Sequence, residues 1–146
     1  MMLVSLILIL LSAVPVATST SVEERREVKC DVTLASDSLK PGASGEILLT
    51  FHPEEGIHIN TEPAMEFDFT KTPSVHFDKI TSMPKAPTTG YLDARRPVKY
   101  GFTVDKKSRK GMIVLKGTVR YYFCSDTEGW CNRFSQPFRL TLTVTR

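Results

Sequence analysis

The chain has 146 residues, a length that accommodates one domain with a modest hydrophobic core. Its composition, 41% hydrophobic and 24% charged, is typical of a globular protein and excludes a disordered tail. The formal net charge is +3, and the basic run at residues 106–110 lies between two strand patterns without interleaved aromatic residues. We therefore expect this run to form a solvated hairpin loop, and we expect no nucleic-acid partner.

The N-terminal residues have the order of an export signal. No charged side chain occurs in residues 1–17, and an apolar run at 3–11 is followed by small residues. This order predicts a signal peptide over residues 1–19, with cleavage near Ala17 to Ser19. An uncleaved membrane anchor is the alternative, although the apolar run is short for a membrane span and Pro15 interrupts it. We expect a linker at 20–27, one domain at 28–146, and a periplasmic or extracytoplasmic location in which disulfides persist.

The rest of the chain alternates apolar and polar residues in short stretches. In the first stretch Val28, Cys30, Val32 and Leu34 alternate with polar residues, the pattern of a half-buried strand. Similar patterns occupy residues 46–52, 57–60, 65–70, 74–78, 98–104, 112–123 and 138–145, with turn residues between them. No amphipathic helix follows the leader. The pattern predicts an immunoglobulin-like β-sandwich of seven to nine antiparallel strands, with a closed barrel as the alternative.

One segment, residues 81–97, breaks this alternation. It contains Pro84, Pro87, Pro97 and Gly90, and an apolar Tyr91-Leu92 pair lies near its middle. Loops this long inside compact domains are often functional. We expect this loop to carry or to shield a site.

The chain has three cysteines, and two of them bracket a predicted hairpin turn. Cys124 and Cys131 end and begin strand-like stretches, and the polar residues between them include a glycine, so the two thiols are expected to be close enough to bridge. Cys30 lies on the apolar face of the first strand and is expected to be a buried free thiol, with pairing to another chain as the alternative.

The cysteine pair has two interpretations. As a structural staple, it would stabilise the fold by roughly 2–3 kcal/mol in the chain-entropy model. As an exchange site, it would sit at a hairpin tip that a partner can reach, with Tyr122 and Trp130 as apolar docking surface beside the sulfurs. The acidic neighbours Asp126 and Glu128 disfavour a thiolate, which suits a domain whose disulfide is attacked by a partner's thiolate.

Other chemistries have little support in the sequence. The three histidines are His52, His58 and His76, and none stands at a zinc-like spacing with the cysteines. No glycine-rich phosphate loop and no nucleophile elbow occur. We expect no metal, no cofactor and no small-molecule substrate.

Three motifs, in this order, resemble one protein family. They are Lys40-Pro41-Gly42 before a strand, Gly56-Ile57-His58-Ile59-Asn60, and a tyrosine-rich strand that leads into the two cysteines before a final threonine-rich strand. Together they resemble the N-terminal periplasmic domain of the thiol:disulfide interchange protein DsbD. The resemblance covers residues 28 to 144, nearly all of the chain after the leader.

The resemblance implies an immunoglobulin-like domain whose cysteine pair shuttles electrons. In the family, a membrane-embedded domain and a thioredoxin-like domain supply the electrons. The recipients are periplasmic proteins, including disulfide isomerases and proteins of cytochrome c maturation. Carried over by motif, Cys124 and Cys131 would be the redox pair, Cys131 the point of mixed-disulfide formation, and Tyr91 the aromatic residue of a loop that caps the pair.

The sequence departs from the family pattern in three ways. The spacing between the cysteines is one residue longer than in the best-known members, and Asn132-Arg133-Phe134 replaces the expected aromatic and prolines. The chain ends after this domain, so we expect the electron donor to be a separate protein. The sequence predicts an exported thiol–disulfide exchange module, a possible thiol–disulfide oxidoreductase. The alternative is a secreted β-sandwich binding module with a purely structural disulfide.

Overall fold

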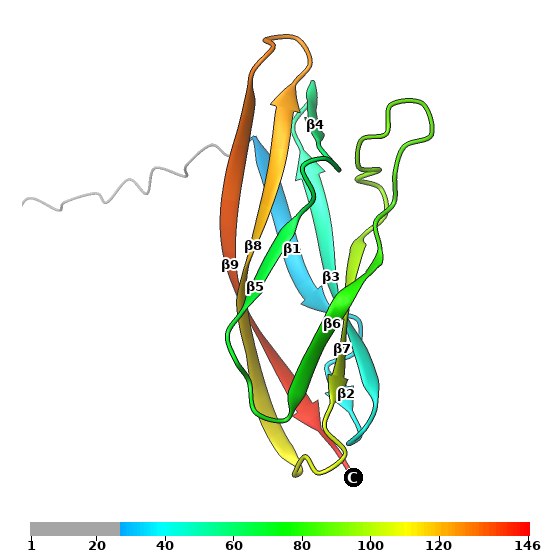
Figure 1. The fold of residues 1–146 in the computed structure, drawn as a ribbon, viewed down its shortest axis with the longest axis vertical. Coiled ribbons are helices and arrows are strands. Elements are labelled where there is room, and N and C mark those ends of the chain that lie inside the picture. Colours follow the sequence, from blue (N-terminus) through cyan, green and yellow to red (C-terminus); the bar gives the residue numbers. More distant parts are fainter. Residues whose placement is uncertain (1–26) are drawn as a thin grey trace, which may run out of the picture.

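The computed structural model describes residues 27–146. The predicted signal peptide and all but the last residue of the predicted linker lie outside the described residues. The described chain forms nine strands and no helix: β1 (Val28–Leu34), β2 (Ser38–Leu39), β3 (Ser44–Pro53), β4 (Ile57–Ile59), β5 (Glu66–Phe69), β6 (Val75–Ser82), β7 (Val98–Val104), β8 (Gly111–Ser125) and β9 (Cys131–Val144) (Figure 1).

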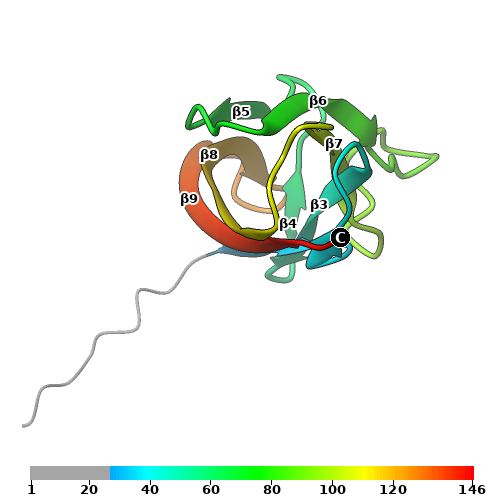
Figure 2. The ribbon, with the colours of Figure 1, turned by 90° about the horizontal axis from the view of Figure 1, so that it is seen from below.

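The strands form two sheets that face each other (Figure 2). One sheet has the order β1-β3-β7-β6, and the other has the order β2-β9-β8-β4, with β5 also paired to β8. The sheet β1-β3-β7-β6 has the strand order of the A-B-E-D layer of an immunoglobulin domain. The other sheet, which contains β4, β8 and β9, corresponds to the opposite layer of strands C, F and G. The predicted all-β, immunoglobulin-like sandwich is therefore confirmed.

The core lies between the inner faces of the two sheets. Alternate residues of β3, β7, β8 and β9 point inward and are fully or almost fully buried, as the period-two pattern requires. The largest fully buried side chains all come from these strands except Ile59 of β4, and they are Tyr121, Phe102, Ile47, Leu49, Ile59, Leu115, Leu142, Val98, Val104, Val119 and Val144. On β8, residues 119, 121 and 123 face the core, so residues 122 and 124 point to the outer face of the sheet.

Several strand limits differ from the sequence pattern. β8 is one continuous strand through Gly117, and β9 begins at Cys131, seven residues before the apolar alternation starts at Phe138. The early part of β9 is largely exposed on both faces, so its side chains carry no period-two signal. The two-residue strand β2 was not predicted, and it pairs with β9 in parallel, whereas the other pairings are antiparallel.

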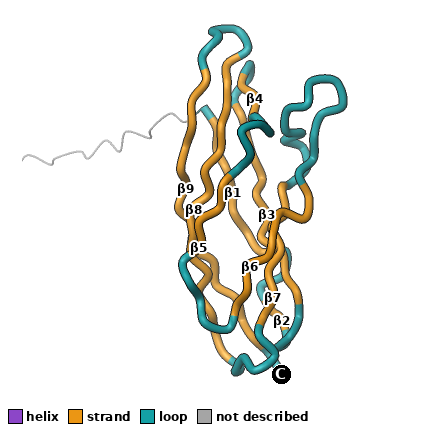
Figure 3. The backbone as a smooth tube through the Cα atoms, viewed as in Figure 1, coloured by secondary structure: helices purple, strands orange, loops and turns teal. Residues whose placement is uncertain are grey.

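Three segments that are distant in sequence meet at one end of the sandwich. The turn between β8 and β9, strand β4 and the loop between β6 and β7 all lie at the top of Figure 1, and the turn and the loop are drawn as teal segments in Figure 3. The fold thus places the cysteine hairpin, the Ile57–Ile59 strand and the proline-rich loop close together.

The burial pattern of β8 generates a stability prediction. Leu115 is fully buried, whereas Met112, three residues earlier on the same strand, is 78% exposed. We expect Leu115→Ala to lower the free energy of unfolding by about 2–5 kcal/mol, because it removes buried methyl groups and leaves a cavity. Met112→Ala is the matched control and should change it by no more than about 0.5 kcal/mol. Urea unfolding measures both, and equal losses would contradict this assignment of the core.

Candidate functional site

The hairpin of β8 and β9 holds the two cysteines directly opposite each other. The pairing register matches Cys124 with Cys131, their Cα atoms lie 4.0 Å apart, and a disulfide joins them. The amide of Ser125 donates to the carbonyl of Trp130 at 2.9 Å, so these two form the hydrogen-bonded pair that closes the hairpin. Since such pairs alternate along an antiparallel ladder, Cys124 and Cys131 form a non-hydrogen-bonded pair, in which side chains approach most closely.

The turn between the cysteines is held by its own backbone and by β4. The Ser125 hydroxyl accepts from the amide of Glu128 at 3.2 Å, and the Gly129 amide donates to the Ser125 carbonyl at 3.1 Å. Gly129 adopts a φ of 71°, a left-handed conformation that glycine adopts without strain. The Asp126 amide donates to the carbonyl of Gly56 at 3.0 Å, which ties the turn to the start of β4.

The two halves of the disulfide differ in exposure. Cys131 is exposed at the first position of β9, whereas Cys124 is 8% exposed. The third cysteine, Cys30, is buried in β1 as a free thiol, as expected, and burial raises its pKa to about 12. An attacking group from outside therefore meets the Cys131 side of the bond, while Cys30 is neither accessible nor readily ionised.

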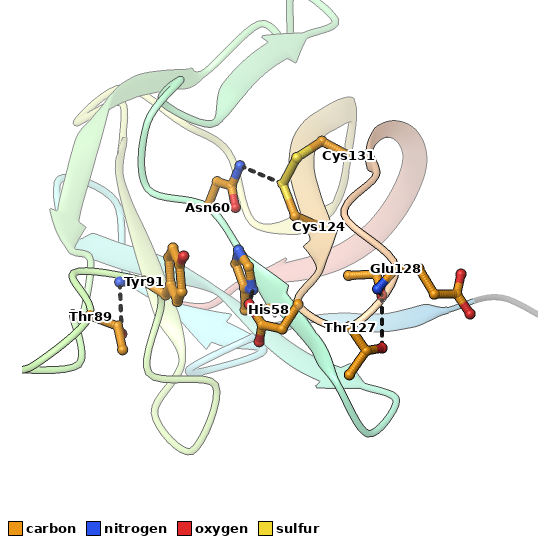
Figure 4. Close-up of polar contacts among 10 residues, drawn as sticks. His58, Asn60, Thr89, Tyr91, Cys124, Thr127, Glu128 and Cys131 are labelled. Carbon is orange, nitrogen blue, oxygen red and sulfur yellow. Dashed lines mark hydrogen bonds and ion pairs between the residues drawn. A yellow bond between two sulfur atoms is a disulfide. The ribbon is translucent and has the colours of Figure 1, made fainter.

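Strand β4 and the residue directly after it supply two polar side chains to the same face of the sheet. His58 pairs in register with Cys124, and residue 60, two positions further along, lies on the same face. The side-chain amide of Asn60 donates from Nδ2 to the Sγ atom of Cys124 at 3.3 Å (Figure 4). His58 Nδ1 lies 2.7 Å from Oδ1 of Asp126 in the cysteine turn, outside the direction of a good hydrogen bond.

The loop between β6 and β7 packs against β4 through Tyr91. The Tyr91 ring stacks on the His58 ring with centroids 3.6 Å apart, and the amide of Leu92 donates to the Ile59 carbonyl at 2.9 Å. In the view of Figure 4, His58 and Asn60 lie between Tyr91 and the disulfide. The structure thus brings Tyr91 onto His58, the β4 residue paired with Cys124, and the role of Tyr91 as a cap of the disulfide stays a prediction.

A buried carboxylate holds the base of this loop. Asp93 is 8% exposed, and it accepts hydrogen bonds from the guanidinium groups of Arg95 and Arg96 at 2.9 and 3.1 Å. Its amide also donates to the Pro84 carbonyl at 2.9 Å, across the two ends of the loop. The hydrogen bonds from Arg95 are the main cause that lowers the pKa of Asp93 to about 2.

The disulfide lies between two hollows that share Asn60. The first has a volume of about 440 Å³, and its lining includes His58, Asn60, Glu62, Lys85, Tyr91 and Cys124. The second has a volume of about 430 Å³ and is lined by Asn60, Pro63, Tyr122, Cys131, Asn132 and Arg133. Each sulfur-bearing residue therefore borders a depression of the surface, and Asn60 stands between them.

The predicted docking aromatics lie on different sides of the sheet. Tyr122 is half-buried on the sulfur face, and its hydroxyl donates to Oε1 of Glu66 at 3.3 Å. Trp130 packs on the core side, with its ring 6.1 Å from that of Phe123, and its indole N–H donates to the Glu128 carboxylate. The structure thus brings Tyr122, but not Trp130, to the face that carries the disulfide, and the docking role of both residues stays a prediction.

Sequence reasoning missed His58 and Asn60 as members of this site. The signal available was the alternation of polar and apolar residues in Ile57-His58-Ile59-Asn60, which places both polar side chains on one face of a strand. That pattern does not predict which strand pairs with β4, because its partner β8 lies more than fifty residues further along the chain.

The described residues show neither a metal cluster nor a membrane helix. Within residues 27–146, no group of three or more His, Cys, Asp or Glu side chains is arranged to hold a metal ion. No helix in this part of the chain has the length and apolar character needed to span a membrane.

Comparisons with known proteins give a likeness in structure but none in sequence. No family model matches the chain, and no curated protein matches it in sequence. Among solved structures, the N-terminal domain of DsbD from Neisseria meningitidis, in the reduced form, aligns over 78% of this chain and 85% of its own. The sequence identity is 13% and the TM-score is 0.39. This neighbour is from the family that the sequence resembles, but a likeness this weak does not show a shared family or activity.

The exposure of the three cysteines predicts an order of chemical modification. After reduction of the disulfide, we expect iodoacetamide at neutral pH to alkylate Cys131 first and Cys124 more slowly. Cys30 should react only when the protein is unfolded, because it is buried and its thiolate is scarce. Mass spectrometry of peptides from timed samples measures the order. Labelling of Cys30 in the folded protein at the rate of Cys131 would contradict the structure.

The lowered pKa of Asp93 predicts a pH dependence of stability. A carboxyl group whose pKa falls on folding contributes stability above its ordinary pKa, and this contribution is lost as the pH falls through the folded value. We expect part of the free energy of unfolding to be lost between about pH 4 and pH 2, and this part should be missing in Asp93→Asn. Urea unfolding across this range measures the difference.

Asp68→Asn is the control, since Asp68 is exposed and has no ion-pair partner within residues 27–146. Identical pH profiles of stability for the two variants would contradict the role of Asp93.

Proposed function

We propose that this protein is an exported thiol–disulfide exchange module, a thiol–disulfide oxidoreductase that passes electrons between other proteins through Cys124 and Cys131. The observation that carries the proposal is the asymmetry of the disulfide. It joins an exposed residue at the start of β9 to a residue that is 8% exposed. A disulfide that only closes a short loop does not require its two cysteines to differ in exposure. Thiol–disulfide exchange requires one sulfur that is attacked and another that leaves as a thiolate.

The position of Cys131 supports access by a protein partner. Strand β2 pairs with β9 only at Thr143 and Val144, so no described strand other than β8 lies beside β9 at Cys131. As a member of a non-hydrogen-bonded pair with β8, Cys131 directs its peptide N–H and C=O away from that strand. A partner segment that approaches this edge meets both the sulfur and free backbone groups.

The exchange proceeds in two balanced steps. A partner's thiolate attacks Sγ of Cys131, the Cys124–Cys131 bond breaks, and the electron pair leaves on Cys124 as a thiolate. A second thiolate of the partner then attacks the partner's own sulfur in the mixed disulfide and releases Cys131 as a thiolate, so the partner is oxidised and the pair is reduced. Transfer onward reverses these steps: Cys131 attacks an acceptor's disulfide, and Cys124 resolves the intermediate.

The chemistry of the pair indicates the class of its partners. The donor is a dithiol protein of thioredoxin-like type or a membrane electron carrier, and the acceptors are extracytoplasmic proteins that carry disulfides. In the family that the sequence resembles, such acceptors include disulfide isomerases and cytochrome c maturation proteins. Export is supported by the apolar run at residues 3–11 and by the disulfide itself, since disulfides persist in oxidising compartments.

A secreted binding module with a structural disulfide is the second candidate. Its support is the gathering of the β8–β9 turn, β4 and the β6–β7 loop at one end of the sandwich, where immunoglobulin-like domains often present their binding loops. There the disulfide only stabilises the hairpin, and Tyr91 and Trp130 contact the partner. Replacing both cysteines by serine would then lower the melting temperature but preserve partner binding.

Trapping tests the exchange function. In Cys124→Ser the exposed Cys131 remains, and a mixed disulfide formed on it cannot be resolved by Cys124. We expect this variant to form a reductant-sensitive adduct with an oxidised thioredoxin-like protein, through the cysteine pair of that protein. Exported from living cells, it should capture partners whose linked cysteines belong to redox-active pairs. Gel mobility with and without reductant, followed by mass spectrometry of the linked peptides, measures both results.

The controls separate the two candidate functions. Cys131→Ser leaves the buried Cys124 as the one cysteine of the pair and should give at least about tenfold less adduct, because Cys124 and the free Cys30 are both buried. The double variant Cys124→Ser/Cys131→Ser should give none. Absence of any adduct with Cys124→Ser, while the double variant still binds its partner, would reject exchange and favour the binding module.

A further inference from the structure

Asn60 makes a contact that a purely structural residue does not need. Its side-chain Nδ2 donates to Sγ of Cys124 at 3.3 Å, while its backbone amide donates to the carbonyl of Tyr122 at 2.8 Å. The second bond continues the β4–β8 pairing one residue beyond the end of β4, so it holds the backbone of Asn60 beside the strand that carries Cys124. The donor is therefore held in place before any reaction begins (Figure 4).

The carbonyl oxygen of the Asn60 side chain does not explain why this position holds an asparagine. Its Oδ1 atom is buried and accepts no hydrogen bond from the described residues. A buried acceptor without a partner costs free energy, so an apolar side chain of similar size would suit this position better if only packing mattered. The contact that an apolar residue would lose is the N–H donation to the sulfur.

In thiol–disulfide exchange, that sulfur is where negative charge appears. When a partner's thiolate attacks Cys131, the bond breaks and the electron pair collects on Sγ of Cys124. A hydrogen bond to a charged acceptor is stronger than one to a neutral acceptor, so the Asn60 donor stabilises the departing thiolate more than it stabilises the intact disulfide. A leaving thiol with a lower pKa also departs faster.

We infer that Asn60 is a catalytic hydrogen-bond donor that stabilises the thiolate of Cys124, so that Cys131 is attacked and Cys124 leaves. This inference rests on the proposed exchange function and adds to it the group that determines which sulfur leaves. The same donor favours the reduced form of the pair, because it stabilises Cys124 as a thiolate.

Other charged and titratable groups also face Cys124. His58 lies opposite it on β4, and Lys85 and Tyr91 line the adjoining hollow from the β6–β7 loop. Glu62 borders that hollow from the segment after β4, and Asp126 and Glu128 belong to the cysteine turn itself. These groups set the background for ionisation of Cys124, and they are unchanged when Asn60 alone is replaced.

The test measures the ionisation of Cys124 directly. In a Cys131→Ser background, Cys124 is the thiol of the pair that remains. Cys30 does not interfere with its titration, because burial raises the pKa of the Cys30 thiol to about 12. Thiolate absorbance at 240 nm is followed against pH with Asn60 present and in Asn60→Leu, which has a similar size but no donor. We expect Asn60→Leu to raise the thiol pKa of Cys124 by about one, the value of a modest charge-assisted hydrogen bond.

A kinetic readout accompanies the titration. With both cysteines present, dithiothreitol should reduce the disulfide of Asn60→Leu about threefold more slowly, if about half of a charge has developed on the leaving sulfur in the transition state. Asn132→Leu is the matched control, because Asn132 follows Cys131 in β9, lines the same hollow as Asn60 and Cys131, and donates no hydrogen bond to Cys124. Asn132→Leu should leave the thiol pKa of Cys124 unchanged. Asn60→Ala replaces Asn60→Leu if the leucine variant fails to fold by circular dichroism.

The outcomes distinguish this inference from the proposed function. A folded Asn60 variant with the parent thiol pKa for Cys124 would overturn the inference, even if Cys124→Ser still traps partners. An equal rise in Asn132→Leu would overturn it too, because the effect would then be general polarity. A raised pKa in Asn60→Leu alone would support the donor role, even if trapping fails and exchange with proteins is rejected.

Discussion

The site depends on the register of one antiparallel ladder, that between β8 and β9. This pairing puts Cys124 opposite Cys131 at a position where the strands approach closely and the backbone hydrogen bonds point elsewhere. A shift of one residue would move every side chain of β8 to the other face and would bury Tyr122 in place of Tyr121. Core packing and the position of the disulfide therefore specify the same register.

Strand β8 also explains why the two sulfurs differ. It is bonded to β9 on one side and to β4 on the other, so His58, Cys124 and Cys131 lie in one row across three strands. The middle residue of such a row is sheltered by its neighbours, and the end residue is open. Asn60, which directly follows β4, donates a hydrogen bond to the Sγ atom of Cys124, and the Tyr91 ring from the β6–β7 loop stacks on His58. The order of the strands thus leaves the Cys131 side of the disulfide accessible and places the Cys124 sulfur where Asn60 can donate a hydrogen bond to it.

Much of this fold was predictable from the sequence, because strands with one buried face carry a period-two pattern, as in Val28–Leu34 and Val98–Val104. The start of β9 at Cys131 was not, since its side chains are exposed on both faces, and β2 is too short to give a pattern. The cysteine hairpin was found from spacing and turn residues. Asn60 was missed because its role depends on a pairing with a distant strand, and Trp130 was placed beside the sulfurs although strand alternation directs it to the core side.

The proposed exchange function requires that the Cys124–Cys131 bond is made and broken in the working life of the protein. The reduction potential of this bond, measured by equilibration of the full chain with glutathione redox buffers, is the decisive quantity. We expect a value above roughly −300 mV, in the range of labile pairs that exchange with other proteins. A value far below that limit, with no exchange with any thioredoxin-like protein, would identify the bond as a structural staple and rule out the exchange function.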